Sequence, residues 1–123
     1  ERFRILGHQD DMDAFYRNLD LYINTSIHEG IPMSVLEAMS YGLPVVAAKV
    51  GGFPEIVQNG EQGFLVDVRN KNAYVDRVLE LILNQDLRLK MAKSARKKIV
   101  DYFSQKTMAE KYYQLYGKLL SRE

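Results

Sequence analysis

The sequence predicts an α/β fold, with a parallel sheet flanked by helices and a helical tail at the end. Short apolar runs alternate with helical patterns through residues 1–67, which is the order expected of βα units. Residues 68–123 carry helical spacing alone. The run Pro44–Ala48 contains no polar residue, as is typical of a strand buried on both faces of a parallel sheet. We therefore expect one domain over residues 1–123, made of βα units and completed by C-terminal helices.

Capping and turn residues mark the boundaries of the elements in the first part. Pro32 suits a first helical turn, where its missing N–H costs nothing, and Gly42 is a suitable helix end. In chain order, the expected elements are a strand Phe3–Leu6 closed by Gly7, a helix from Asp10 or Asp11 to about Asn18, a strand Leu21–Thr25, a helix Pro32–Tyr41, a strand Pro44–Ala48, a short helix Phe53–Gln58, a turn at Asn59-Gly60 and a fourth strand Gly63–Val66.

Three helices are expected after Asp67, because apolar residues recur there at helical spacing. They cover Asn72–Leu83, Leu87–Phe103 and Met108–Leu120. We interpret the tyrosines of the last helix as packing residues, with docking against another domain as the alternative. These tyrosines are Tyr112, Tyr113 and Tyr116.

The composition is that of an ordinary globular domain. The 123 residues are 46% hydrophobic and 27% charged, which is enough for a real core. No apolar run approaches the roughly 18 residues that span a bilayer, and the opening ERFRILG is not a secretory signal. The chain has no cysteine, which excludes disulfides and thiolate metal sites and agrees with a cytoplasmic location. Because no initiator Met is present, we expect a piece of a longer protein.

Charge is unevenly placed along the chain. Residues 1–85 hold 7 Lys/Arg and 12 Asp/Glu, giving −5, and residues 86–123 hold 10 Lys/Arg and 4 Asp/Glu, giving +6. Most of the excess is a basic run over residues 88–98. We interpret this run as a solvated helical face, with a patch for anionic lipid headgroups or an acidic partner as the alternative. Nucleic acid is not expected as a partner, since no aromatic interleaving or binding motif accompanies the charge.

The segment EGIPMSVLE, from Glu29 to Glu37, is the main candidate for a binding site. One carboxylate precedes a helix start and the other lies little more than one turn inside it. Between them, the amides of Met33, Ser34 and Val35 should be free donors, and a helix N-terminus with free amides favours a phosphate or diphosphate. Amides for a diphosphate and carboxylates for hydroxyl groups together predict a nucleotide-sugar site. Taken singly, Glu29 could only stabilise the helix dipole and Glu37 could only be an exposed helix residue.

Three stretches should meet at the carboxyl edge of the sheet, where ligands of open α/β sheets bind. They are Gly7 to Gln9, Ser26 to Met33 and Lys49 to Pro54. Gly51 and Gly52 in the last stretch let the backbone approach a ligand closely and tolerate a positive φ, and a branched side chain at Gly52 would fit poorly if φ is positive there. A tight strand-to-helix turn would need these glycines too. His8 could contact a base or phosphate, or could simply be solvated. No metal site is expected, because two isolated histidines lack ligand spacing.

A phosphate-accepting receiver domain is a rival of similar size, and Asp10-Asp11 resembles its acidic pair. Such a domain needs an acceptor aspartate at the end of a central strand, whereas the strands here end in Thr25-Ser26 and Ala48-Lys49. The sequence therefore excludes this rival.

The chain resembles the C-terminal half of retaining glycosyltransferases of the GT-B fold, the group 1 family with the E-x7-E motif. The resemblance covers nearly the whole chain and rests on the F-x-x-L-G opening, the D-x-x-x-F-Y-x-x-x-D helix and the segment EGIPMSVLEAMSYGLPVVAAKVGGFPEIVQNGEQGFLV. It implies a Rossmann-like domain that binds a UDP- or GDP-type nucleotide sugar and transfers the glycosyl group to an acceptor hydroxyl with retention, without a metal or other cofactor.

The resemblance also implies roles for individual residues. Glu29 would touch the donor sugar as the catalytic glutamate, and Glu37 would hold the ribose hydroxyls. The diphosphate and sugar would be bound by the loop and helix start between them, with Gly7 and His8 near the base and Gly51 and Gly52 in the second loop. The loop and helix start comprise Gly30, Ile31, Pro32, Met33 and Ser34.

Two departures from the family pattern affect these expectations. Pro32 stands where many members have a second glycine, which removes one amide from the site. The Arg/Lys pair that binds the diphosphate, and the N-terminal acceptor domain, are not in this chain. The isolated chain should therefore bind a donor weakly and be inactive. A non-catalytic nucleotide-sugar-binding or scaffolding module of the same fold stays open as an alternative, as does peripheral membrane association of the full protein.

Overall fold

The computed structural model describes residues 3–121 and contains a three-stranded parallel sheet. The strands are β1 (Tyr22–Asn24), β2 (Val45–Ala48) and β3 (Gly63–Val66), and they lie in the order β1-β2-β3. Tyr22 pairs with Val45, which in turn pairs with Gly63. This arrangement confirms the predicted α/β class with a parallel sheet.

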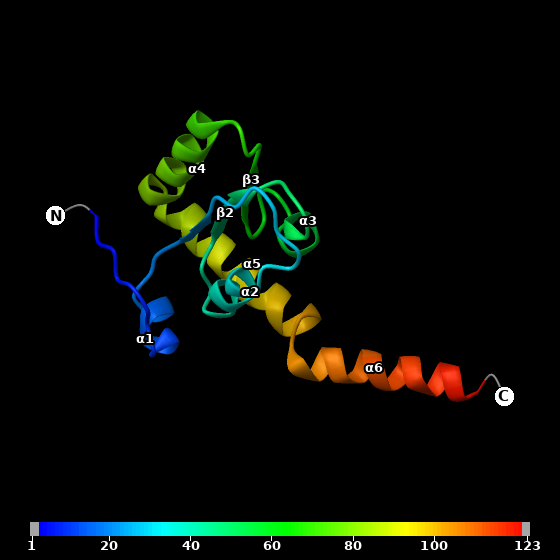
Figure 1. Cartoon of the computed structure of the whole chain (residues 1–123). Coiled ribbons are helices and arrows are strands. Elements are labelled where there is room, and N and C mark those ends of the chain that lie inside the picture. The colour runs from blue at the N-terminus through cyan, green and yellow to red at the C-terminus, as the bar shows by residue number, and fades with distance from the viewer. Residues whose placement is uncertain (1–2, 122–123) are drawn as a thin grey trace.

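Six helices connect and flank the strands within the described residues (Figure 1). They are α1 (Met12–Arg17), α2 (Met33–Ser40), α3 (Phe53–Ile56), α4 (Lys71–Leu83), α5 (Gln85–Tyr102) and α6 (Gln105–Leu120). Side-chain caps begin four of them, because the oxygens of Asp11, Asn70, Asn84 and Ser104 accept the otherwise unpaired first-turn amides. The expected end of α2 is confirmed by Gly42, which follows its C-cap with a φ of 74°.

The core lies on both faces of β2, whose four residues are all fully buried. Successive strand side chains point to opposite faces. Accordingly, Val45 and Ala47 pack with α2, α3 and the C-terminal half of α5, whereas Val46 packs with β3, α4 and Met91 of α5. The long helix α5 therefore contributes to both clusters, and the expectation of a fully buried strand is confirmed.

The expected strand Phe3–Leu6 is wrong. Residues 3–9 form no strand, and Figure 1 shows this segment running apart from the sheet toward α1. Phe3 and Ile5 are 79% and 87% exposed. A strand exists only where a neighbouring strand pairs with its backbone groups, and within residues 3–121 no strand pairs with this segment. Gly63–Val66 is therefore the third strand instead of the fourth.

Helix α6 extends away from the rest of the molecule (Figure 1). Tyr112, Tyr113 and Tyr116 are 53%, 82% and 59% exposed, so our interpretation of them as packing residues is wrong for this chain. Tyr112 and Tyr116 instead stack on each other, with ring centroids 6.2 Å apart. Among residues 3–121, no helix is both long enough and apolar enough to cross a bilayer.

Candidate functional site

The loops that follow β1 and β2 form an open pocket at the carboxyl ends of these strands. The pocket has a volume of about 600 Å³ and is lined by Ile27, His28, Glu29, Gly30, Val50 and Gly51. Two of the three stretches expected to converge therefore do so. Gly7 and His8 do not join them, because they line a separate pocket with Arg4, Leu6, Gln9, Met12 and Phe15. Ile27, His28 and Val50 lie within the two expected stretches, but the sequence analysis did not select them individually as site residues.

The two glycines bring the two loops into direct backbone contact. Gly51 has a φ of 52°, and a Cβ built on it would lie 1.8 Å from the carbonyl oxygen of Glu29. The amide of Gly52 donates to the carbonyl oxygen of Gly30 at 2.9 Å, and a Cβ there would lie 2.4 Å from that oxygen. No residue with a side chain fits such distances. The turn after β2 therefore packs directly against the backbone of Glu29.

The reason we expected for Gly52 differs from the one observed. We expected that a positive φ at Gly52 could make it intolerant of a branched side chain, but its φ is −80°. The positive φ lies at Gly51 instead. Position 52 requires glycine for a different reason: its backbone lies so close to that of Gly30 that any larger residue would overlap with it.

The N-terminus of α2 offers two free amides instead of three. Pro32 is the N-cap, one residue before the helix, and its carbonyl accepts from the amides of Val35 and Leu36 at 3.1 and 3.3 Å. The amide of Val35 is therefore not free, contrary to our expectation. In the described part of the chain, the amides of Met33 and Ser34 donate to no backbone carbonyl, so both can meet an anion.

Glu37 lies in the second turn of α2 and is bound by a residue that sequence reasoning did not select. The hydroxyl of Tyr16 on α1 donates to Oε2 of Glu37 at 3.0 Å. Tyr16 is only 2% exposed, and burial, reinforced by the hydrogen bond to Glu37, holds the pKa of its hydroxyl well above the usual value. One signal was available, since a buried tyrosine hydroxyl usually finds a hydrogen-bond partner.

A second polar contact ties α1 to α2. Asp13 accepts from the hydroxyl of Tyr41 at 2.8 Å and pairs with Arg17 at 2.7 Å. These hydrogen bonds, first from Arg17 and then from Tyr41, lower the pKa of Asp13. The ring of Tyr41 also stacks on Tyr16 at 5.3 Å between centroids. Together these contacts pack α1 against α2, and neither the bond to Asp13 nor the ring of Tyr41 reaches the carboxylate of Glu37.

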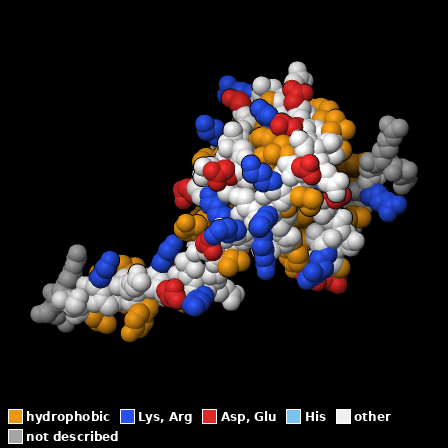
Figure 2. Space-filling view, turned by 180° about the vertical axis from the view of Figure 1, so that it is seen from behind, with side chains coloured by type: hydrophobic (Ala, Val, Ile, Leu, Met, Phe, Trp, Pro, Cys, Tyr) orange, Lys and Arg blue, Asp and Glu red, His pale blue; other side chains and the backbone are white. Residues whose placement is uncertain are grey.

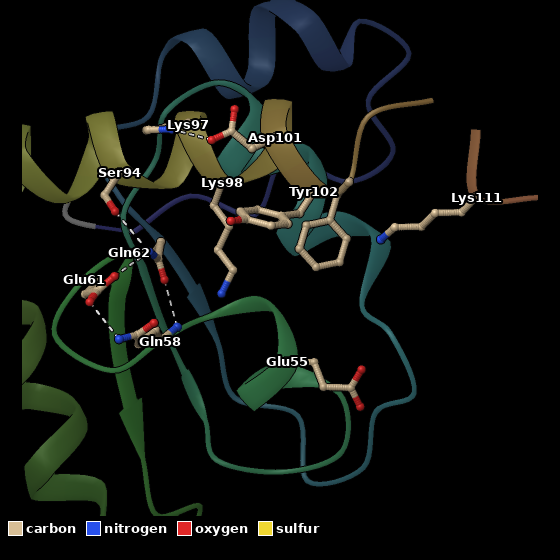
Figure 3. Close-up of a pocket in the computed structure, with 11 residues that line it drawn as sticks. Glu55, Gln58, Glu61, Gln62, Ser94, Lys97, Lys98, Asp101, Tyr102 and Lys111 are labelled. Carbon is tan, nitrogen blue, oxygen red and sulfur yellow. Dashed lines mark hydrogen bonds and ion pairs between the residues drawn. The ribbon is translucent and has the colours of Figure 1, made fainter. Parts of the chain in front are cut away.

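A further pocket, of about 520 Å³, lies on another side of the molecule between α3, α5 and α6 (Figure 3). The side chain of Gln62, just before β3, is buried there and bonds to Ser94 at 3.0 Å and to the amide of Gln58 at 2.8 Å. Lys98 and Lys111 also line this pocket. Because Gln62 precedes β3, this pocket adjoins the amino end of that strand, whereas ligands of open α/β sheets bind at the carboxyl ends. We therefore place the candidate site at Glu29.

The basic run of α5 is partly explained by contacts within the chain. Figure 2 shows Lys and Arg side chains gathered on one face of the molecule. Arg88 donates to the carbonyls of Leu81 and Ile82 at the end of α4, Arg96 donates to the carbonyl of Ser40, and Lys97 pairs with Asp101. Three of the six cations over residues 88–98 therefore have structural partners.

Comparison with known proteins identifies the family. The family model described as "Glycosyl transferases group 1" matches residues 1–98. The N-acetyl-alpha-D-glucosaminyl L-malate synthase of Bacillus anthracis is 29% identical over 120 residues, which cover 98% of this chain and 32% of that enzyme. This chain belongs to the group 1 glycosyltransferases, and it spans about a third of the length of the curated relatives it matches.

Solved structures agree with this assignment. The structure of Anabaena HepE in complex with UDP superposes with a TM-score of 0.87 at 27% identity, over 92% of this chain and 31% of that one. The C-terminal domain of a group 1 glycosyl transferase, LpcC, from Francisella tularensis superposes with a TM-score of 0.74 at 28% identity, over 84% of this chain and 53% of that one. The parallel sheet with flanking helices is thus that of GT-B glycosyltransferases.

Proposed function

We propose that this chain is the donor-binding domain of a retaining glycosyltransferase of the E-x7-E type. The whole protein would transfer a sugar from a nucleotide diphosphate to an acceptor hydroxyl in the synthesis of a polysaccharide or glycoconjugate. The observation that carries the proposal is the pocket at the carboxyl ends of β1 and β2, which contains Glu29 and adjoins the loop leading to the free amides of α2. Membership of the family, and the UDP bound to HepE, support the same ligand class.

Each part of the site has a proposed task. Glu29 contacts the donor sugar as the catalytic glutamate, and the carboxylate of Glu37 accepts hydrogen bonds from the ribose hydroxyls. The amides of Met33 and Ser34 face the diphosphate, with Gly30, Ile31 and Pro32 shaping the approach to the helix. Gly51 and Gly52 hold the Glu29 loop in place through backbone contact. The proposal gives Gly7 and His8 no role, because they line a separate pocket.

The work of this domain in the reaction is positioning and charge stabilisation. Fixed amides at a helix N-terminus stabilise the negative charge of the departing diphosphate without reorganising during the reaction. We propose that no metal takes part, that an N-terminal domain supplies the acceptor site and closes over the donor, and that the reaction takes place on the cytoplasmic side. On this proposal, the isolated chain binds a donor weakly and does not turn it over.

The first test is an NMR titration of the labelled chain with UDP, GDP and their glucose conjugates, following the backbone amides. We expect shifts that cluster at residues 28–35 and 50–52 for nucleotides of one base. Shifts confined to the pocket around Gln62 would overturn the assignment of the site. No shift with any of these nucleotides at millimolar concentration would overturn the proposal for this chain.

A pair of variants then tests the assigned carboxylate. Replacing Glu37→Ala should weaken binding of the nucleotide by a factor of about 10 to 150, since hydrogen bonds to a charged group contribute about 1.5–3 kcal/mol. The matched control is Glu110→Ala, which removes an exposed glutamate of α6 whose ion pair with Lys106 is long, at 4.0 Å. Equal affinity of the Glu37 variant and the wild type would contradict the ribose role of Glu37.

A further inference from the structure

The hydroxyl of Tyr16 and the carboxylate of Glu37 form the closest side-chain link between α1 and the candidate site. The O–O distance is 3.0 Å, and the alternative acceptor, the carbonyl oxygen of Ser34, lies farther away at 3.4 Å. A tyrosine hydroxyl has one proton to donate. The shorter bond, to the charged acceptor, is therefore the main one.

The ring of Tyr16 is held on three sides, so its hydroxyl has little freedom to move. Phe15 contacts it edge-on, Tyr41 stacks on it, and Tyr22 lies against it, with centroid distances of 5.3, 5.3 and 6.3 Å. Ala38 and Leu43 complete this cluster. A donor fixed in this way determines where Oε2 of Glu37 can lie.

The bond leaves most of the carboxylate free for a ligand. An ionised carboxylate can accept at about four lone-pair sites, and Tyr16 uses one of them. Within residues 3–121, Glu37 forms no ion pair, and the residue is exposed. Glu37 is therefore oriented by a neutral donor without being neutralised by a cation.

We propose that Tyr16 is a positioning residue for nucleotide binding: it holds the carboxylate of Glu37 in the orientation that receives the ribose hydroxyls. This inference rests on the proposed function. A free glutamate side chain has several rotamers and loses that freedom when a ligand binds. Tyr16 imposes the restriction before the ligand arrives, and such preorganisation increases affinity.

The link persists at neutral pH because Tyr16 stays protonated. Burial, followed by the hydrogen bond and the charge of Glu37, raises the pKa of its hydroxyl, so the donor proton is retained. The other groups that face Tyr16 are Tyr22 and Tyr41, which add smaller effects in the same direction. Between pH 6 and 8, the hydroxyl of Tyr16 should therefore remain the donor in its hydrogen bond to Glu37.

The test compares Tyr16→Phe with Tyr41→Phe. The first variant keeps the ring packing and removes only the hydroxyl that reaches Glu37. The second also removes a hydrogen bond between α1 and α2, but that bond ends on Asp13. Each chain is titrated by NMR with the nucleoside diphosphate that the wild type binds, UDP or GDP, and with its 2′,3′-dideoxy analogue.

We expect Tyr16→Phe to weaken binding of the ribonucleotide about fivefold, as the cost of ordering one freed side chain on binding predicts, and to leave the affinity for the dideoxy analogue unchanged. Tyr41→Phe should leave both affinities unchanged. A loss that is equal for the two ligands, or equal in the two variants, would show that Tyr16 acts only in packing α1 and would overturn the inference. So would an unchanged affinity of Tyr16→Phe for the ribonucleotide.

Failure of the proposed function gives a different result. If the wild type binds neither nucleotide, the proposed function is wrong. If Glu37→Ala binds as tightly as the wild type, the ribose role of Glu37 is wrong. In either case the inference falls with it. If Glu37→Ala loses affinity while Tyr16→Phe does not, only the role of Tyr16 is rejected. Thermal unfolding of each variant checks that the comparison is made between folded chains.

Discussion

The turn at Gly51 and the helix α6 lie near opposite extremes of packing density in the molecule. At Gly51, backbone lies so close to Glu29 that a Cβ atom would overlap its carbonyl oxygen. On α6, by contrast, large apolar side chains such as Tyr113 are mostly exposed. Both regions follow their expected local conformation. The difference shows that local sequence determines whether a segment forms a helix or a turn. Whether that segment is buried depends on the presence of another segment that packs against it.

The largest expected effect tests this contrast directly. Phe53 is fully buried against β2 and α2, so Phe53→Ala should lower the free energy of unfolding by about 3–5 kcal/mol. Tyr113→Ala removes an aromatic ring that is 82% exposed, and it should change that free energy by about 0.5 kcal/mol or less. Urea denaturation of both variants measures the two values. Similar losses would show that α6 packs against the body in solution.

The second prediction separates close packing from backbone conformation. Gly51→Ala should destabilise the fold by about 3 kcal/mol or more, because the new methyl group adds overlap with Glu29 to the strain of a positive φ. Gly60 also has a positive φ, of 87°, but has open space around its Cβ position, so Gly60→Ala should cost only about 1–2 kcal/mol. The two midpoints of urea denaturation provide the comparison. Equal costs would mean that the loops separate easily.

The smallest predicted effect compares two exposed asparagines that should contribute differently to stability. The side chain of Asn84 accepts from the amide of Leu87 at 2.9 Å and caps α5, so Asn84→Ala should cost about 1 kcal/mol. Asn72 is also exposed and lies in the first turn of α4, but its side chain makes no hydrogen bond within residues 3–121. Asn72→Ala should therefore be nearly neutral or slightly stabilising, and the difference in melting temperature measures the cap.

Elements with strong local signals could be predicted from the sequence. Helix α2, with Gly42 at its end, and the wholly apolar strand β2 were found close to their observed bounds. The strand Phe3–Leu6 was also predicted from its apolar residues, yet within residues 3–121 no strand lies beside it. Strand formation depends on pairing with another segment, and no local pattern contains that information.

The same reason explains which parts of the candidate site were found. Glu29 and the glycines after β2 could be identified because they follow strands whose carboxyl ends lie at one edge. Tyr16 could not, because its bond to Glu37 joins residues 21 positions apart and depends on how α1 packs. The proline at position 32 was placed one residue too far into the helix, which changed the count of free amides.

The loops that follow β1 and β2 should be exchanged only together in protein engineering. Gly52 donates a hydrogen bond to Gly30, and a side chain at Gly51 would overlap with Glu29. Replacing residues 26–32 by the corresponding loop of a relative would disturb this contact with the turn after β2. Residues 49–53 should be moved in the same graft. Chimaeras carrying one loop alone are expected to express poorly, whereas those carrying both loops from one relative keep backbones that fit each other.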